Sequence, residues 1–227
     1  MNFLPQRLFK FYLFVFFSLT GISMTGAQTN KTIDLKGIWR FDTDRKDTGV
    51  QERWFSKKLP DKITLPGSMT ENYKGDDVTL HTEWTASIYD SSFFYNPRLE
   101  KFRKQDNLKL PFWLTPVKYY VGVAWYQTDI EVPASWNGDL IQLFLERPHT
   151  ETRVWINDKE IGMQNSLCVP HIFEISRYLK KGKNTISLRI DNRTKDIDVG
   201  KDSHSITDQT QGNWNGVVGR LELQAIP

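Results

Sequence analysis

Cysteine is nearly absent from this sequence of 227 residues, which contains only Cys168. A single cysteine excludes an intrachain disulfide framework and a metal site built from several thiolates of one chain. Free cysteine is among the residue types most often buried, so we expect Cys168 to be a small buried hydrophobic side chain. The histidines lie far apart, without the paired spacing of zinc ligands, and no metal centre is predicted. They are His81, His149, His171 and His204.

Motifs of common catalytic and nucleotide-binding sites are missing as well. The chain has no G-x-S-x-G elbow, no phosphate-binding P-loop and no G-x-G-x-x-G fingerprint. Glycoside hydrolysis needs two positioned carboxylates, but a sequence alone cannot pair them, because strand residues far apart in the chain converge in the fold. No catalytic residue and no cofactor is therefore predicted.

One acidic stretch leaves two interpretations open. Its aspartates could supply oxygen ligands to a calcium ion, although their spacing matches no EF-hand loop. Arg193, Lys195 and Lys201 are interleaved with them, which favours a solvated, charge-balanced loop. The aspartates are Asp191, Asp196, Asp198 and Asp202.

Charge of one sign is not in excess. The formal net charge is +3, and residues 1–27 hold two basic residues and no acidic ones, so the remainder carries 28 − 27 = +1. A nearly neutral domain gives no electrostatic reason to expect nucleic acid or an anionic membrane as a partner.

The N-terminal residues have the pattern of a secretion signal. Arg7 and Lys10 precede an apolar run, and Thr25-Gly26-Ala27 supplies the small residues of a cleavage site. The run is interrupted by polar residues and is short for a membrane span, which disfavours the alternative of a membrane anchor. We expect a signal peptide over 1–27, secretion or export to a bacterial periplasm, and no membrane attachment after cleavage.

Helical periodicity is also scarce, and from Lys31 onward the dominant period of apolar residues is two. Ile141, Leu143 and Leu145 show the alternation of a half-buried strand, and only residues 175–179 predict a short helical turn. Many short strands joined by polar turns predict an all-β fold, an antiparallel β-sandwich or jelly roll, over residues 28–227 without a linker.

Residues 70–118 break this alternation, because polar and aromatic residues are mixed there. Aromatic density argues against disorder, so we expect an ordered insertion that covers one end or face of the sandwich. The aromatic residues are Trp84, Tyr89, Phe93, Phe94, Tyr95, Phe102, Phe112 and Trp113.

Several short sequence motifs follow one another in a specific order. They are Leu35-x-Gly37-x-Trp39-x-Phe41, Ile63-x-Leu65-Pro66-Gly67-Ser68, the run from Tyr120 to Tyr126 that leads to Ile130-x-Val132-Pro133, Leu143-x-Leu145-Glu146-Arg147, Val154-Trp155-Ile156-Asn157, and Asn213-Trp214-Asn215-Gly216 continuing to Leu221. Their order and spacing resemble the N-terminal sugar-binding domain of family 2 glycoside hydrolases, the group of β-galactosidases and β-glucuronidases. The resemblance covers most of residues 33–225.

The resemblance implies a galactose-binding-like jelly roll that packs beside a catalytic barrel and can lend a loop to its sugar pocket. The closing segment of this chain occupies the matching position. Its polar side chains suit sugar hydroxyls and Trp214 offers a stacking face, although the same residues suit a tight turn and Trp214 could instead plug the core. The sugar-contact candidates are His204, Asp208, Gln209, Asn213, Trp214 and Asn215, with Trp113 from the insertion.

A barrel needs about 250 residues, more than this chain offers after residue 27, and Pro227 stands where the family's second domain should start. The resemblance therefore assigns no catalytic residue here. Three hypotheses remain: a secreted carbohydrate-binding accessory domain, a truncated or detached N-terminal part of a glycosidase that acts with a separate catalytic domain, and a structural or protein-interaction sandwich.

Overall fold

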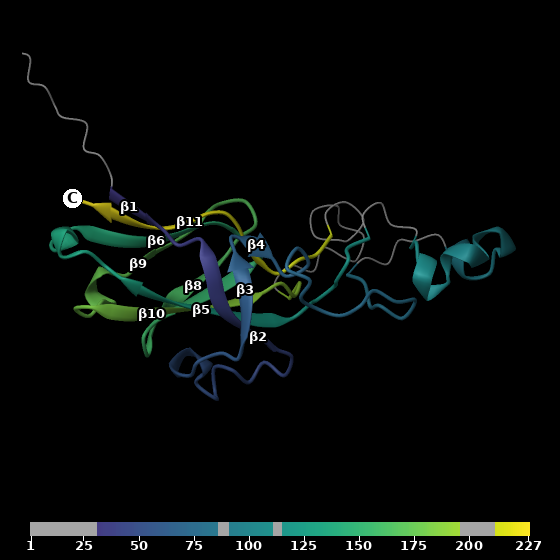
Figure 1. Ribbon diagram of the computed structural model, residues 1–227, viewed down its shortest axis with the longest axis horizontal. Coiled ribbons are helices and arrows are strands. Elements are labelled where there is room, and N and C mark those ends of the chain that lie inside the picture. The colour runs from purple at the N-terminus through teal and green to yellow at the C-terminus, as the bar shows by residue number, and fades with distance from the viewer. Residues whose placement is uncertain (1–30, 86–90, 111–114, 196–211) are drawn as a thin grey trace, which may run out of the picture.

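The computed structural model describes residues 31–85, 91–110, 115–195 and 212–227, and it consists of two facing antiparallel sheets (Figure 1). One sheet has the strand order β1-β11-β6-β9, with β4 beside β11, and the other has the order β3-β2-β5-β10-β7-β8. The strands are β1 (Lys31–Asp34), β2 (Gly37–Asp44), β3 (Asp61–Leu65), β4 (Gly67–Ser68), β5 (Val123–Glu131), β6 (Leu140–Pro148), β7 (Glu151–Ile156), β8 (Lys159–Asn165), β9 (His171–Glu174), β10 (Lys183–Asp191) and β11 (Gly216–Ile226).

The helices of the described residues are short and of 3-10 type. They are η1 (Trp54–Ser56), η2 (Ser91–Phe94), η3 (Pro97–Phe102), η4 (Gln105–Asn107), η5 (Ala134–Trp136) and η6 (Ser176–Tyr178). The all-β antiparallel sandwich and the short helical turn near residue 176 are thereby confirmed. Within the described ranges, no helix has the length and apolar character that crossing a membrane requires.

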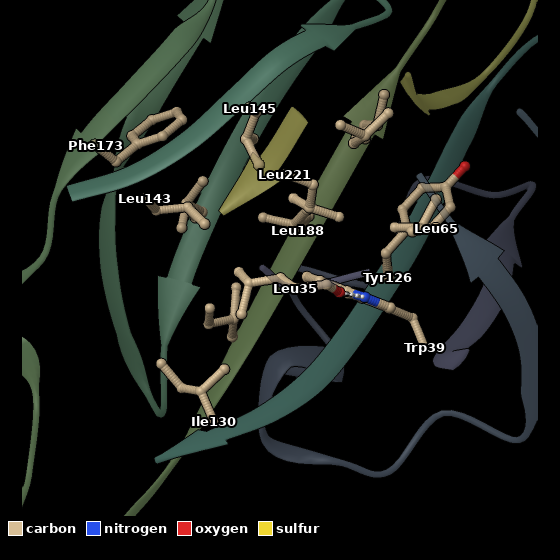
Figure 2. Close-up of a cluster of buried hydrophobic side chains, with 14 of the residues drawn as sticks. Leu35, Trp39, Leu65, Tyr126, Ile130, Leu143, Leu145, Phe173, Leu188 and Leu221 are labelled. Atoms are coloured by element: carbon tan, nitrogen blue, oxygen red, sulfur yellow. Dashed lines mark hydrogen bonds between the residues drawn. The ribbon is translucent and has the colours of Figure 1, made fainter. Parts of the chain in front are cut away.

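The main core lies between the sheets and follows from the period-two alternation. Leu143, Leu145 and Leu221 point inward from one sheet and meet Leu188 and Tyr126 from the other (Figure 2). All five are at most 1% exposed. Full burial of each such aliphatic side chain contributes about 1.5–3 kcal/mol, so the core is the main reason that the sheets pair.

The outer face of the six-stranded sheet is buried as well, which the alternation did not predict. Trp125 and Trp155 point away from the main core and are covered by the segment that follows β2, where Phe55 stacks on Trp155 with ring centroids 5.4 Å apart. The Ser56 hydroxyl donates to Asp158 in the β7–β8 turn at 2.6 Å and fixes this cover. A second hydrophobic cluster therefore forms on the outside of the sheet.

Beside this cluster, the outer face of β10 carries a buried charged network. The Arg189 guanidinium donates to Glu151 at 2.9 Å and to Asp47 at 2.6 Å. Lys195 contacts Glu151 at 2.8 Å and Asp191 at 2.9 Å. Asp191 is fully buried, so the expectation of a solvated acidic loop is wrong for this residue. The other three aspartates of that stretch, Asp196, Asp198 and Asp202, lie outside the described residues. The ion pairs replace the water that burial removes.

Part of the 70–118 segment extends beyond one end of the sandwich. The chain over 91–110, hereafter the arm, contains η2, η3 and η4 and lies away from both sheets (Figure 1). Its base forms a small separate cluster of Val78, Phe93, Leu110 and Tyr119. The arm therefore packs at its base, through Phe93 and Leu110, against Val78 and Tyr119, and it does not cover a sheet face.

The expectation that Cys168 is buried is wrong. Cys168 is exposed in the connection between β8 and β9. These strands are edge strands of the two sheets, and Leu167 and Val169 beside it are exposed too. An apolar residue in a connection between edge strands has no layer above it to bury it.

Arg189→Met is expected to lower the free energy of unfolding by about 3 kcal/mol, because it leaves buried Glu151 without its buried cation partner, while Lys195 is the more exposed of the two. Urea denaturation followed by circular dichroism measures the change. As a control, Lys36→Met removes a cation from the exposed pair with Asp34 and should leave the midpoint unchanged. Equal midpoints for Arg189→Met and the unaltered chain would contradict the prediction.

Candidate functional site

The predicted sugar contacts divide into those that the structure describes and those that it does not. His204, Asp208, Gln209 and Trp113 lie outside the described residues, as does the predicted signal peptide. Asn213, Trp214 and Asn215 lie just before β11, at one end of the sandwich. We call this region, together with His149 and Asn192, the closing end.

The side chain of Asn215 is used by the fold. It is 1% exposed, and its amide nitrogen donates to the carbonyls of Gly122 at 3.0 Å and Ile190 at 3.1 Å. Its oxygen accepts a hydrogen bond from the Tyr126 hydroxyl at 2.7 Å. Both amide hydrogens and the oxygen are therefore engaged, and Asn215 joins β11 to the opposite sheet.

Asn213 is also buried and pairs with Asn192, the residue that follows β10. The Asn192 amide donates to the Asn213 oxygen at 2.9 Å, and the Asn213 amide donates to the Asn192 carbonyl at 3.0 Å. The Asn213 amide also lies 3.3 Å from the Thr85 hydroxyl. Thr85 is 3.0 Å from the hydroxyl of Tyr119, a member of the small cluster at the base of the arm. Asn213 thus links the closing end to the arm.

Trp214 is half-buried and stacks on His149. The ring centroids are 4.7 Å apart and the planes meet at 25°. The backbone carbonyl of Trp214 lies 2.7 Å from His149 Nδ1, so this nitrogen carries the hydrogen and donates it. Burial lowers the pKa of His149 to about 4, and the imidazole is neutral near pH 7. The pair forms an uncharged aromatic surface that remains partly open to solvent.

His149 was not a sequence candidate, since it is an isolated histidine after the end of β6. The pairing of Val217 with Pro148 places it beside Trp214. No local pattern carries this information, because it depends on the register between two strands about 70 residues apart in the chain.

The Asp191 carboxylate, next to the closing end, is held in its ionised form. Burial opposes the charge of Asp191, but hydrogen bonds from Arg193 and Lys195 outweigh it and hold its pKa well below the usual value. A general acid for glycoside hydrolysis requires the opposite shift, a raised pKa. Within the described ranges, no three His, Cys, Asp or Glu residues are grouped so as to hold a metal ion.

Comparisons with known proteins show which family has this architecture. A family model described as "Glycosyl hydrolases family 2, sugar binding domain" matches residues 32–227. The chain belongs to this family. It is related to family 2 glycosidases through their sugar-binding domain.

Individual relatives carry this domain within longer chains. A β-glucuronidase of Paenibacillus borealis is 25% identical over 165 residues, which is 72% of this chain and 22% of that protein. A β-galactosidase of Priestia megaterium is 25% identical over 69% of this chain and 14% of its own length. The chain thus spans less than a quarter of either relative.

Solved structures agree on the fold. A β-glucuronidase of Ruminococcus gnavus in complex with uronic isofagomine matches 88% of this chain and 29% of its own, with a TM-score of 0.58 and 19% identity. A β-glucuronidase from an uncultured Clostridium matches 88% of this chain and 30% of its own, with a TM-score of 0.57 and 19% identity.

Asn215→Ala is expected to lower the free energy of unfolding by about 3 kcal/mol, because it leaves three buried partners without a hydrogen bond. Urea denaturation measures the loss. Asn137→Ala, at an exposed position, is the matched control and should change stability little. Similar midpoints for the two variants would contradict the structural role of Asn215.

His149 is expected to make stability depend on pH. Its pKa is about 4 in the folded chain, against 6.5 for an unperturbed histidine, so the unfolded chain binds more protons between these values. Stability from this residue is complete above about pH 6.5 and falls as the pH decreases toward 4, by at most about 3 kcal/mol.

His149→Phe would keep an aromatic ring against Trp214 but could not take a proton. The free energy of unfolding of this variant is therefore expected to depend less on pH between 6.5 and 4. Urea unfolding at pH 7, 6, 5 and 4 tests the effect, with His81→Phe as a control at an exposed histidine. Buried His171, whose pKa burial also lowers, is unaltered in both variants. If the free energy of unfolding of His149→Phe fell with decreasing pH as steeply as that of the unaltered chain, the assignment to His149 would be wrong.

Proposed function

We propose that this chain is a non-catalytic carbohydrate-binding domain of a family 2 glycosidase, which contributes a sugar-contacting surface to a pocket completed by a separate catalytic domain. The observation that carries the proposal is the half-buried Trp214 ring, fixed against neutral His149 at the closing end of a sugar-binding-domain fold. A flat aromatic face suits the apolar face of a sugar ring.

The geometry of Trp214 supports this role. The His149 hydrogen bond holds the Trp214 carbonyl, and Asn213 and Asn215 are fixed by buried hydrogen bonds on either side. The indole is therefore held in place before a ligand arrives. Preorganisation of this kind reduces the entropy that binding would otherwise lose.

The division between binding and chemistry also has support. The relatives are a β-glucuronidase and a β-galactosidase, and this chain covers only 22% and 14% of their lengths. We propose that hydrolysis belongs to a separate catalytic domain. The pattern of residues 1–27 supports secretion or export to a periplasm as the setting, since extracellular glycans are the substrates that such a domain would meet.

The test is a binding measurement with the full chain. Isothermal titration calorimetry with phenyl β-D-glucuronide and phenyl β-D-galactoside is expected to show weak binding of at least one of them. Trp214→Ala should weaken that binding at least about tenfold, which corresponds to 1.4 kcal/mol.

The matched control is Trp54→Ala, because Trp54 is half-buried on the outer face of the six-stranded sheet and packs at a tilt against Trp125. This variant should bind the sugar as the unaltered chain does. Equal losses in the two variants, or the absence of binding by the unaltered chain to these glycosides and to a panel of polysaccharides, would favour a structural or protein-interaction sandwich instead.

A further inference from the structure

The arm differs from the rest of the chain in its charge. Residues 91–110 contain five basic and two acidic residues, which gives 5 − 2 = +3. Residues 28–227 as a whole carry +1, so the remainder carries 1 − 3 = −2. The net excess of positive charge in this nearly neutral domain thus comes from a single projecting element (Figure 1).

Most of this charge is available to a ligand. Arg98, Lys101, Lys104 and Lys109 are exposed, and none forms an ion pair with the parts of the chain that the structure describes. Arg103 is different, since it donates to the carbonyls of Phe93 and Asn96 and so holds the turns of the arm together. Four cations of the arm therefore face solvent, and the hydrogen bonds of Arg103 hold the backbone that carries them.

Two of these cations share an aromatic ring. The Nζ atoms of Lys101 and Lys109 lie 4.9 Å and 5.3 Å from the centroid of the Phe102 ring. The Lys109 backbone amide donates to the Phe102 carbonyl at 3.0 Å, which fixes the two segments side by side. Both ammonium groups therefore lie around one ring, so this part of the arm presents two cations to a ligand.

The arm also exposes aromatic surface. Tyr95 is 72% exposed and Phe94 is 44% exposed, next to Phe93, which anchors the arm in its cluster. Exposed rings among cations fit a ligand that combines flat sugar faces with negative charge. Arm and closing end are connected, because Thr85 contacts both Tyr119 and Asn213.

We propose that the arm binds an anionic polysaccharide whose sugar rings carry carboxylates, at a site separate from Trp214. The inference rests on the proposed function, because the family favours a glycan over other polyanions. The net negative charge of the remainder confines the contact to the arm. Exposed cations of this kind are screened within about 8 Å at physiological salt, so the interaction depends strongly on ionic strength.

The experiment uses affinity electrophoresis of the full chain in gels that contain polygalacturonate or its fully methyl-esterified form. The two polymers share a backbone and differ in charge. Retardation is expected in polygalacturonate, at least fivefold weaker in the ester, and lost in 0.5 M NaCl. K101Q/K109Q should reduce the affinity for polygalacturonate at least fivefold.

The matched control is K180Q/K181Q, which removes the same charge from exposed positions between η6 and β10. It should retain affinity, and thermal unfolding should show that both variants are folded. Equal retardation by the two polymers, or equal losses in the two double variants, would overturn the proposal. Tighter binding to a single-stranded DNA oligomer or to polyglutamate of matched charge would overturn it in favour of nucleic acid or an acidic protein.

The two proposals fail in distinguishable ways. Trp214→Ala reports on the small glycosides and should leave polygalacturonate retardation unchanged, whereas K101Q/K109Q should leave glycoside binding unchanged. Loss of polygalacturonate retardation in Trp214→Ala would show that the arm is not a separate site.

Discussion

The side-chain amide of Asn215 joins the two sheets at the closing end, and the positions of the neighbouring residues depend on it. Its hydrogen bonds to the carbonyl of Ile190 and the hydroxyl of Tyr126 connect the start of β11 to β10 and β5. Because these groups are buried, each would lose a hydrogen bond without replacement by water if the amide moved. The backbone before β11 is therefore fixed, and with it the direction of the Trp214 ring.

The same constraint explains why three adjacent residues serve different purposes. Asn213 and Asn215 face inward and satisfy buried polar groups, while Trp214 between them is half-buried and rests on His149. Two buried asparagines with fixed side chains thus hold a half-buried aromatic residue between them. Gly216 completes the arrangement, since its φ of 142° and a Cβ position 2.4 Å from the Gly67 carbonyl oxygen leave no room for a side chain.

The strands and the main core can be predicted from the sequence, because the alternation of apolar residues shows which side chains lie on the same face of a strand, as at Leu143 and Leu145. Alternation cannot show that a loop covers the second face, so the burial of Trp155 was not predicted. Nor can it give the register that brings His149 to Trp214. The sequence predicts a sugar contact for Asn215 because an amide suits sugar hydroxyls, but an amide suits buried carbonyls equally well. Only the geometry separates these uses.

The net charge of the domain hides the unequal distribution of charge between the arm and the remaining residues. A net charge of +1 over residues 28–227 argues against a polyanionic partner for the domain as a whole, yet this value is the sum of +3 on the arm and −2 elsewhere. Through Thr85, the arm is anchored to Asn213 at the end of the sandwich that holds Trp214. A glycan long enough to reach both would contact the neutral aromatic face of Trp214 with one part and the basic arm with another. Recognition of one sugar ring and attraction of a charged polymer would then rest on different residues of the same end, which permits each to vary independently.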